Sequence, residues 1–172
     1  GGAGRYRGGL GYEKHIRMLK DAHFMSIADR SILACWGVKG GKAGGSFSVT
    51  LNPGQANERE FDALTDAEPI LAGDTIRIRT TGGGGWGDPL ERPIESVEQD
   101  VLWGKVSREF AAKDYGVVIA EDTATADVEA SEKLRAEMRN ARGLDEPFFD
   151  RGPGYEQLSG GAKFAEYDFI DR

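Results

Sequence analysis

The chain has 172 residues, of which 39% are hydrophobic and 30% charged, a composition typical of a soluble globular protein with one core. Its net charge of -7, with no block of Lys and Arg, excludes general binding of nucleic acid. No apolar run reaches the ~20 residues of a membrane helix, and a single cysteine excludes an internal disulfide, so we expect a cytoplasmic protein with no membrane segment.

Alternation of apolar and polar residues predicts strands in the first half of the chain. The alternation over 10–19 is interrupted at 20–22, and its parity is mixed over 23–28. This pattern predicts two adjacent strands joined by a hairpin turn or separated by a bulge. Further strands are predicted at 46–51, 58–64 and 75–80.

The spacing of apolar residues becomes helical after residue 90. A short helix is predicted over 94–102, ending near Gly104. Ser107 is the predicted N-cap of a second helix over 108–115, and Gly116 occupies its C-terminal cap position.

The last third of the chain loses its apolar periodicity in steps. A short strand is predicted at 117–120 and an exposed helix at 127–142, with Leu134 and Met138 on one face. From 144 to 172 aromatic residues punctuate a Gly- and Asp-rich stretch without a period. Such a stretch suits an arm that lies over another surface.

These elements predict the α+β class. The N-terminal two-thirds is expected to be rich in antiparallel strands, arranged as a barrel or as a sandwich, with short helices following. We divide the chain into a core unit at 1–120, which includes two short helices within 94–116, an exposed helix at 121–143 and an extended C-terminal arm at 144–172.

Of the 25 glycines, 16 lie in three segments, 1–11, 37–45 and 82–87. Glycine loses more backbone entropy on folding than any other residue, so such runs indicate positive φ angles or very close backbone contacts. In the third segment four glycines lead into Trp86, between a predicted strand and the first predicted helix. We interpret this run as the junction between the two kinds of structure.

Two of these segments resemble nucleotide-binding motifs only superficially. The glycine spacing over 82–87 matches a dinucleotide fingerprint, but Pro89 and Pro93 delay any helix and no second parallel strand follows. The segment 37–42 suggests a phosphate loop, but Ala43 stands where Ser or Thr would hold magnesium. Neither motif predicts a nucleotide site.

A few charged residues are candidates for binding. Arg5 and Arg7 could present guanidinium groups to a carboxylate or phosphate, or could form a structural salt bridge. Asp29, Arg30 and Asp88 are better explained as residues that fix loops through side-chain to backbone hydrogen bonds.

The sequence predicts no metal site. His15 and His23 are eight residues apart, about 26 Å along one strand at ~3.3 Å per residue, so they could share a metal only across a hairpin. Cys35 has apolar neighbours and no evident base, which favours a buried, inert thiol.

Several separate motifs, in order over about residues 1–140, resemble the hydantoinase B family, which includes N-methylhydantoinase B subunits, 5-oxoprolinase and related ketone carboxylase subunits. Two positions depart from its usual pattern: Cys35 precedes Trp36, and a tryptophan stands at Trp86. The motifs are Gly2–Gly9, Asp29-Arg30, Trp36-Gly37 with Gly40-Gly41, Ala72-Gly73-Asp74, Thr81–Arg92, and Gly104 to Ser107 with Tyr115–Val118.

The resemblance implies the C-terminal part of a B subunit that works with a hydantoinase A type subunit in a hetero-oligomer. ATP and Mg would bind to the A subunit, which activates the lactam or ketone carbonyl by phosphorylation. A divalent metal would lie in the N-terminal part of the B subunit, outside this fragment. This fragment would bind no cofactor and would be inactive alone, and its catalytic residues remain unassigned.

Three functions follow as hypotheses. The first is part of an ATP-dependent cyclic amide hydrolase acting on hydantoin, 5-oxoproline or a related lactam. The second is a subunit of an ATP-dependent ketone carboxylase, and the third is a non-catalytic, β-rich interaction module. Loop residues that could contact substrate or a partner subunit are Arg5, Arg7, Asp29, Arg30, Trp36, Gly84, Trp86 and Asp88.

Overall fold

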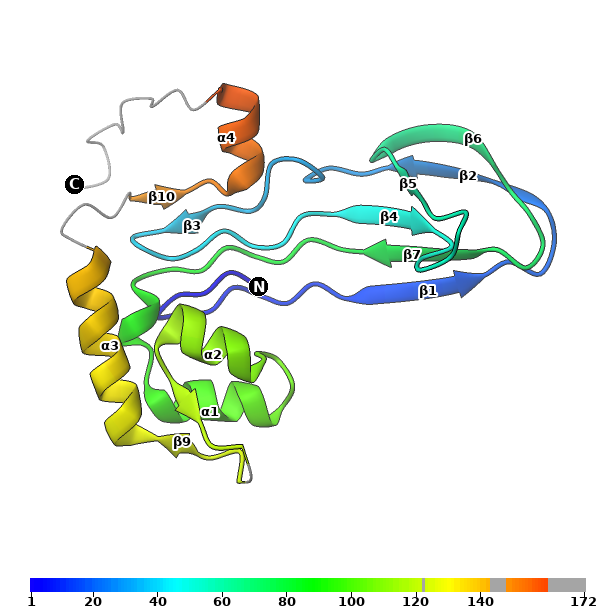
Figure 1. The fold of residues 1–172 in the computed structure, drawn as a ribbon. Helices are drawn as coiled ribbons and strands as arrows, with labels where there is room; N and C mark the ends of the chain where they lie inside the picture. The colour runs from blue at the N-terminus through cyan, green and yellow to red at the C-terminus, as the bar shows by residue number, and fades with distance from the viewer. Residues whose placement is uncertain (122, 143–147, 161–172) are drawn as a thin grey trace.

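The structure is a computed structural model that describes residues 1–121, 123–142 and 148–160. A β-rich part and a helical part are joined by long irregular segments of the first 90 residues (Figure 1). The predicted α+β class, with antiparallel strands and short helices, is confirmed.

The largest sheet has four antiparallel strands in the order β1-β7-β4-β5. Ile76 of β7 lies opposite Ile16 of β1 on one side and Leu51 of β4 on the other. The strands are β1 (Glu13–Arg17), β4 (Ser48–Leu51), β5 (Arg59–Phe61) and β7 (Thr75–Arg79), which matches four of the predicted segments.

The strand β2 (Ala22–Ile27) does not pair with β1. It pairs instead with β6 (Leu64–Ile70), a strand that sequence periodicity missed because Ala67, with a φ of +55°, and Pro69 interrupt the alternation. The predicted hairpin between the first two strands is therefore wrong. The alternative, a bulge, is found inside the β2–β6 pair, where the register shifts between Phe24 and Ser26.

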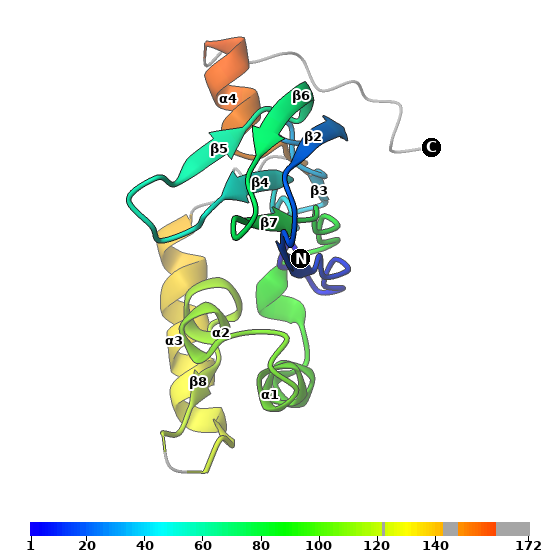
Figure 2. The same cartoon turned by 90° about the vertical axis from the view of Figure 1, so that its right-hand side faces the viewer.

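The two sheets share one hydrophobic core. Val49, Leu51 and Ile76 come from the larger sheet, and Ile70 from β6, and all four are at most 8% exposed. Phe24 of β2 packs against this cluster, so the β2–β6 pair is held on the larger sheet by its inward face. The β2–β6 pair is therefore a second layer beside the four-stranded sheet (Figure 2).

The three predicted helices are found, and α2 has both of its predicted caps. The helices are α1 (Ile94–Leu102), α2 (Arg108–Tyr115) and α3 (Val128–Arg142), with the short strands β8 (Val118–Ile119) and β9 (Ala126–Asp127) between the last two. A short helix that was not predicted, η1 (Pro89–Glu91), precedes them. The Ser107 hydroxyl accepts a hydrogen bond from the Phe110 N–H at 3.1 Å, and Gly116 takes a φ of +60°. These contacts stop α2 at both ends as the sequence indicates.

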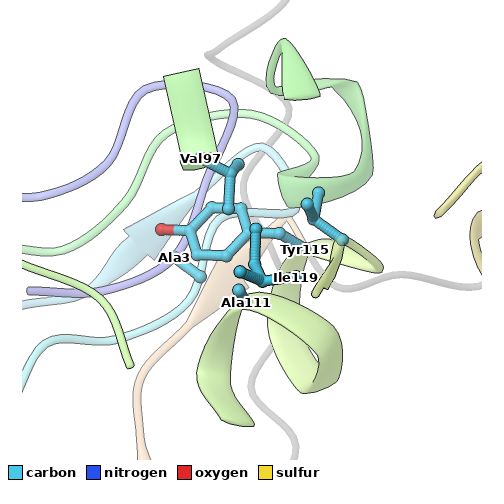
Figure 3. Packing of buried hydrophobic residues seen from close by; sticks show 6 residues of the cluster. Ala3, Val97, Ala111, Tyr115 and Ile119 are labelled. Carbon is cyan, nitrogen blue, oxygen red and sulfur yellow. The ribbon is translucent and has the colours of Figure 1, made fainter. Parts of the chain in front are cut away.

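A second core holds this helical part to the start of the chain. Tyr115 of α2 is 2% exposed and lies among Val97, Ala111 and Ile119, with Ala3 from the first glycine-rich segment on its other side (Figure 3). The N-terminal segment is thus part of the helical core as well as of the β-rich part.

The helix α3 packs more closely than predicted. The face that carries Leu134 and Met138 also carries Ser131 and Arg135, which are 0% and 8% exposed. Ser131 accepts a hydrogen bond from the Val118 N–H at 2.9 Å, which ties the helix to β8.

The stretch without periodicity contains regular structure where it is described. Strand β10 (Phe149–Asp150) pairs antiparallel with β3 (Gly37–Val38), and helix α4 (Pro153–Ser159) follows it. The rest of the predicted arm, at 143–147 and 161–172, lies outside the described residues.

Candidate functional site

The three glycine-rich segments lie side by side and form one structure, which we call the glycine junction and define as residues 1–11, 35–45 and 80–87. Backbone hydrogen bonds hold the first segment to the third and the second to both. They include Gly2 N–H to Gly83 O at 2.8 Å, Gly83 N–H to Gly9 O at 2.9 Å, Lys42 N–H to Ala3 O at 2.7 Å, Gly85 N–H to Lys42 O at 2.9 Å and Gly87 N–H to Val38 O at 2.9 Å.

Close contact between backbones explains the glycines of the junction. A Cβ atom on Gly84 would lie 1.7 Å from the Trp36 carbonyl oxygen, and one on Gly85 would lie 1.9 Å from that of Ala3. Of the run at 82–87, only Gly87 has a positive φ, at +74°. Gly84 and Gly85 are needed because no side chain fits between the segments at these positions, whereas Gly87 is needed for its backbone conformation.

The junction presents Trp86 on the surface beside Tyr6. Their rings lie 5.6 Å apart and are 44% and 61% exposed. Two backbone hydrogen bonds of 2.9 Å between these residues fix both positions, and the Lys39 ammonium lies 5.6 Å from the Trp86 ring. Trp86 therefore does not fill a core, and its contact with a partner subunit stays a prediction.

Trp36 lies on the same junction, against the last described part of the chain. It is 41% exposed, and its ring meets Phe149 of β10 at 5.6 Å. The Arg151 guanidinium lies 5.2 Å from Trp36, 5.4 Å from Phe149 and 5.0 Å from Tyr155. Segment 149–155 thus covers one side of the junction with aromatic and cation–π contacts.

Arg7 is engaged inside the protein. Its guanidinium donates to both carboxylate oxygens of Asp100, at 3.0 and 3.3 Å, and the two side chains are 14% and 5% exposed. Arg92 donates to the same carboxylate at 2.9 Å. Of the two interpretations of Arg7, the geometry supports the structural salt bridge. Arg5 remains 51% exposed at its side chain and reaches Glu91 at 3.5 Å.

Asp88 ends the junction and begins the helical part. Its carboxylate accepts from the Leu90 N–H at 2.8 Å, which caps η1, and from both ends of the Arg142 guanidinium at 3.0 and 2.8 Å. Burial of Asp88 opposes its ionisation, but these hydrogen bonds and the charges of Arg142 and Arg139 outweigh that effect and lower the pKa of the carboxyl.

Asp29 and Arg30 lie apart from the junction, in the turn after β2. The Asp29 carboxylate accepts from the Arg30 N–H at 2.7 Å, where Arg30 has a φ of +65°. The Arg30 carbonyl in turn accepts from the Phe47 N–H at 2.9 Å. These contacts match the predicted loop-fixing role.

No local pattern predicts that Arg7 pairs with Asp100 or that Asp88 pairs with Arg142. Three arginines of α3 lie three or four residues apart and so share one side of the helix, a pattern that the sequence shows: Arg135, Arg139 and Arg142. Arg135 donates to the carbonyls of Tyr115 at 2.9 Å and Arg92 at 2.8 Å, and Arg139 donates to that of Leu90 at 3.1 Å. These residues fasten α3 to η1 and α2.

Metal-ligating side chains are not clustered in the part of the chain that the structure describes. Across 1–121, 123–142 and 148–160, no three His, Cys, Asp or Glu side chains are close enough to hold a metal ion. His15 lies on β1 opposite Arg77, and His23 lies on β2 opposite Pro69. Cys35 is partly exposed rather than buried as predicted.

The glycine junction and the helices that follow it form an α+β unit. Comparison with known proteins assigns this unit to a family. The family model for hydantoinase B/oxoprolinase matches residues 1–89, and the chain belongs to this family. The matched segment contains all three parts of the glycine junction and ends at the start of η1.

Individual relatives agree with this assignment. The chain is 39% identical over 139 residues to the uncharacterized protein MJ0963 of Methanocaldococcus jannaschii, covering 78% of this chain and 24% of that protein. It is 36% identical to the caprolactamase subunit beta of Pseudomonas jessenii, covering 69% and 21%. It is 28% identical to the acetone carboxylase alpha subunit of Xanthobacter autotrophicus, covering 83% and 23%.

A solved structure shows the same fold. The crystal structure of the ATP-dependent caprolactamase from Pseudomonas jessenii matches with a TM-score of 0.64 and 30% identity, covering 78% of this chain and 24% of that one. The chain thus spans about a quarter of the length of the relatives it matches. In the part of the chain that the structure describes, no helix has the length and apolar character needed to cross a membrane.

Proposed function

We propose that the chain is the C-terminal portion of the B subunit of an ATP-dependent cyclic amide hydrolase, acting on hydantoin, 5-oxoproline or a related lactam in the cytoplasm. The observation that carries this proposal is the likeness to caprolactamase, at 36% identity in sequence and a TM-score of 0.64 in structure. Both matches are to an enzyme whose name states a lactam substrate.

In this proposal the other components lie outside the chain. ATP and Mg bind to an A-type partner subunit, and a divalent metal lies in the N-terminal part of the B subunit. Metal-ligating side chains are not clustered among the described residues, so we assign no metal-dependent step to this chain. N-methylhydantoins remain within the substrate class that we propose.

In this proposal the chain itself holds exposed side chains in fixed positions for contact with the rest of the enzyme. Interlocked backbones hold Tyr6 and Trp86 in place, because each is bonded to the other and Gly87 is bonded to Val38. The exposed side chain of Arg5 lies beside them, next to Glu91. We propose that these residues contact the remaining B polypeptide or the A subunit, since rigid, exposed aromatic and arginine side chains are typical of interface hot spots.

A ketone carboxylase subunit is the second candidate. The acetone carboxylase alpha subunit covers more of this chain, 83%, than caprolactamase subunit beta does, 69%. Both reactions would begin with phosphorylation of a carbonyl oxygen, which converts it to a better leaving group or to an enol phosphate. They would differ in the second step, as attack by water or as addition to carbon dioxide or bicarbonate.

The test is an assay of the native complex, captured from its source cells through this chain. We expect ATP-dependent hydrolysis of 5-oxoproline, caprolactam or a hydantoin, and no fixation of labelled bicarbonate onto acetone or acetophenone. Bicarbonate fixation without lactam hydrolysis would establish the second candidate instead. ATP-dependent hydrolysis by the purified 172 residues alone would contradict the proposed location of the metal and nucleotide sites.

A further inference from the structure

Two groups of exposed apolar side chains lie outside the glycine junction. The first, the ribbon patch, consists of Met25 and Ile27 of β2 and Leu64 of β6, which are 60%, 80% and 71% exposed. Ile27 and Leu64 lie directly opposite each other in the strand pair. Together with Ser26, Thr65 and Asp66 they line an open concavity of about 330 Å³.

The rim of the ribbon patch is acidic. The Ala28 N–H donates to the Ala63 carbonyl at 3.0 Å, which continues the pairing and brings Asp29 and Asp62 to the end of the two strands. Both are exposed, as is Asp66 on β6. The nearest cations in sequence are Arg30, whose guanidinium is directed to the Ala34 carbonyl at 3.5 Å, and Arg59, whose guanidinium binds Glu68 of β6 at 2.9 Å.

The second group, the helix patch, lies where α1 passes into α2. Leu102, Trp103 and Phe110 are 66%, 63% and 50% exposed. The Lys105 ammonium lies 4.1 Å from the Trp103 ring, and that of Lys113 lies 5.9 Å from the Phe110 ring. The rings of Trp103 and Phe110 therefore each have a lysine ammonium near one face.

The helix patch is basic in a protein that is acidic overall. The stretch 102–114 contains the three cations Lys105, Arg108 and Lys113 against the two carboxylates of Glu109 and Asp114, whereas the whole chain has a net charge of -7. The two patches are therefore opposite in charge and similar in apolar character. Two ribbon patches would repel each other, and so would two helix patches.

The two patches cannot meet within one molecule. The β2–β6 pair lies at one end of the molecule and the α1–α2 pair at the other, in both perpendicular views (Figures 1 and 2). We propose that the ribbon patch of one copy binds the helix patch of a second copy, so that copies of this chain associate head to tail. Such an interface leaves one free patch at each end, which allows a ring or an open chain of copies. This proposal does not depend on the reaction that the family member catalyses.

Sedimentation velocity on the 172-residue chain tests the proposal. We expect a sedimentation coefficient that rises with protein concentration and falls as salt screens the opposite charges. Two double variants each disable one patch at exposed positions: Ile27→Lys with Asp62→Lys, and Leu102→Ser with Lys113→Ser. Each should raise the dissociation constant at least about tenfold and remain monomeric where the parent associates.

Mixing the two double variants gives the decisive result. Each retains the patch that the other has lost, so the mixture should form a one-to-one dimer that grows no further. Lys133→Glu, an exposed change on α3, is the matched control and should associate like the parent. A parent chain that is monomeric at every concentration, association that survives in both double variants, or a mixture that stays monomeric would each overturn the proposal. Circular dichroism melts confirm that every variant is folded before comparison.

Discussion

At the scale of single residues, the chain depends on positions where a side chain is forbidden. Gly84 passes so close to the Trp36 carbonyl that an added Cβ atom would lie 1.7 Å from the oxygen. The atoms that an added Cβ would meet belong to the backbone of Trp36 and Cys35, so they cannot rotate away. Gly45, in the same junction, has nothing within 4 Å of an added Cβ atom. The two positions allow steric need to be separated from glycine content.

We predict that Gly84→Val destabilises the chain by about 3 kcal/mol or more, because the segments of the junction must separate to admit the side chain. Gly45→Val should cost much less. Urea unfolding followed by circular dichroism compares the two variants. Equal losses of stability at both positions would show that the tight packing around Gly84 is unimportant.

The charge of Asp88 contributes to the link between η1 and α3. The pKa of this carboxyl is held below the ordinary value of 3.8, so the ionised form stabilises the folded state. This stabilisation is complete above the unfolded pKa and is lost as the pH falls through the lower, folded pKa.

We therefore predict that Asp88→Asn lowers the free energy of unfolding by about 1–3 kcal/mol at neutral pH, since it leaves Arg142 without its carboxylate partner. The difference from the parent should shrink as the pH falls below 3.8, where the parent carboxyl also becomes protonated. Urea unfolding at several pH values measures it, with Glu137→Gln, exposed on α3, as the control. A difference that is constant with pH would contradict an electrostatic role.

At the scale of elements, the helices are specified locally and then fastened by arginines. The α2 helix begins at the Ser107 cap and ends at Gly116, and both signals are visible in the sequence. The position of α3 is set instead by bonds to distant carbonyls, such as that from Arg135 to Tyr115 at 2.9 Å.

We predict that Ser107→Ala costs about 1 kcal/mol, because the Phe110 N–H loses its acceptor at the first turn of α2. Ser107→Asp should retain most of the stability, since a carboxylate also accepts this hydrogen bond. Thermal melts of both variants decide the point, and an Asp variant as unstable as the Ala variant would argue against capping.

At the scale of the whole molecule, the end of the described chain closes over the glycine junction. The Lys39 N–H donates to the Phe148 carbonyl at 2.7 Å, and the Ala43 N–H donates to the Asp150 carboxylate at 3.0 Å. Gly152 lies against the side chains of Ala34 and Ala43. The second segment of the junction is therefore held from both sides.

Deletion of 144–172 should expose this segment without unfolding the rest. Amide hydrogen exchange at Lys39 and Ala43 should accelerate at least about tenfold, because both lose their acceptors. The amide of Gly85, bonded to the Lys42 carbonyl at 2.9 Å, is the internal control and should be unaffected. Unchanged exchange at Lys39 and Ala43 would show that β10 contributes little to the order of the junction.

Local signals in the sequence determined most elements of this protein. Alternation predicted β1, β4, β5 and β7, and the caps Ser107 and Gly116 bounded α2, because both kinds of signal act between near neighbours along the chain. The family was also recognisable, because several separate glycine-containing motifs stand in order along the chain at compatible spacing. The aromatic and arginine candidates were found by residue type, and their roles stay predictions.

Only the tertiary structure decided which segments meet. Pairing of β2 with β6, the ion pair of Arg7 with Asp100 and the bond from Arg142 to Asp88 join residues separated by tens of positions. No local pattern encodes such partners, because they depend on how the chain folds back on itself. The glycine run shows the difference most clearly: the sequence marked where the backbone must be bare, and the fold supplied the reason, which is another backbone less than a side chain's width away.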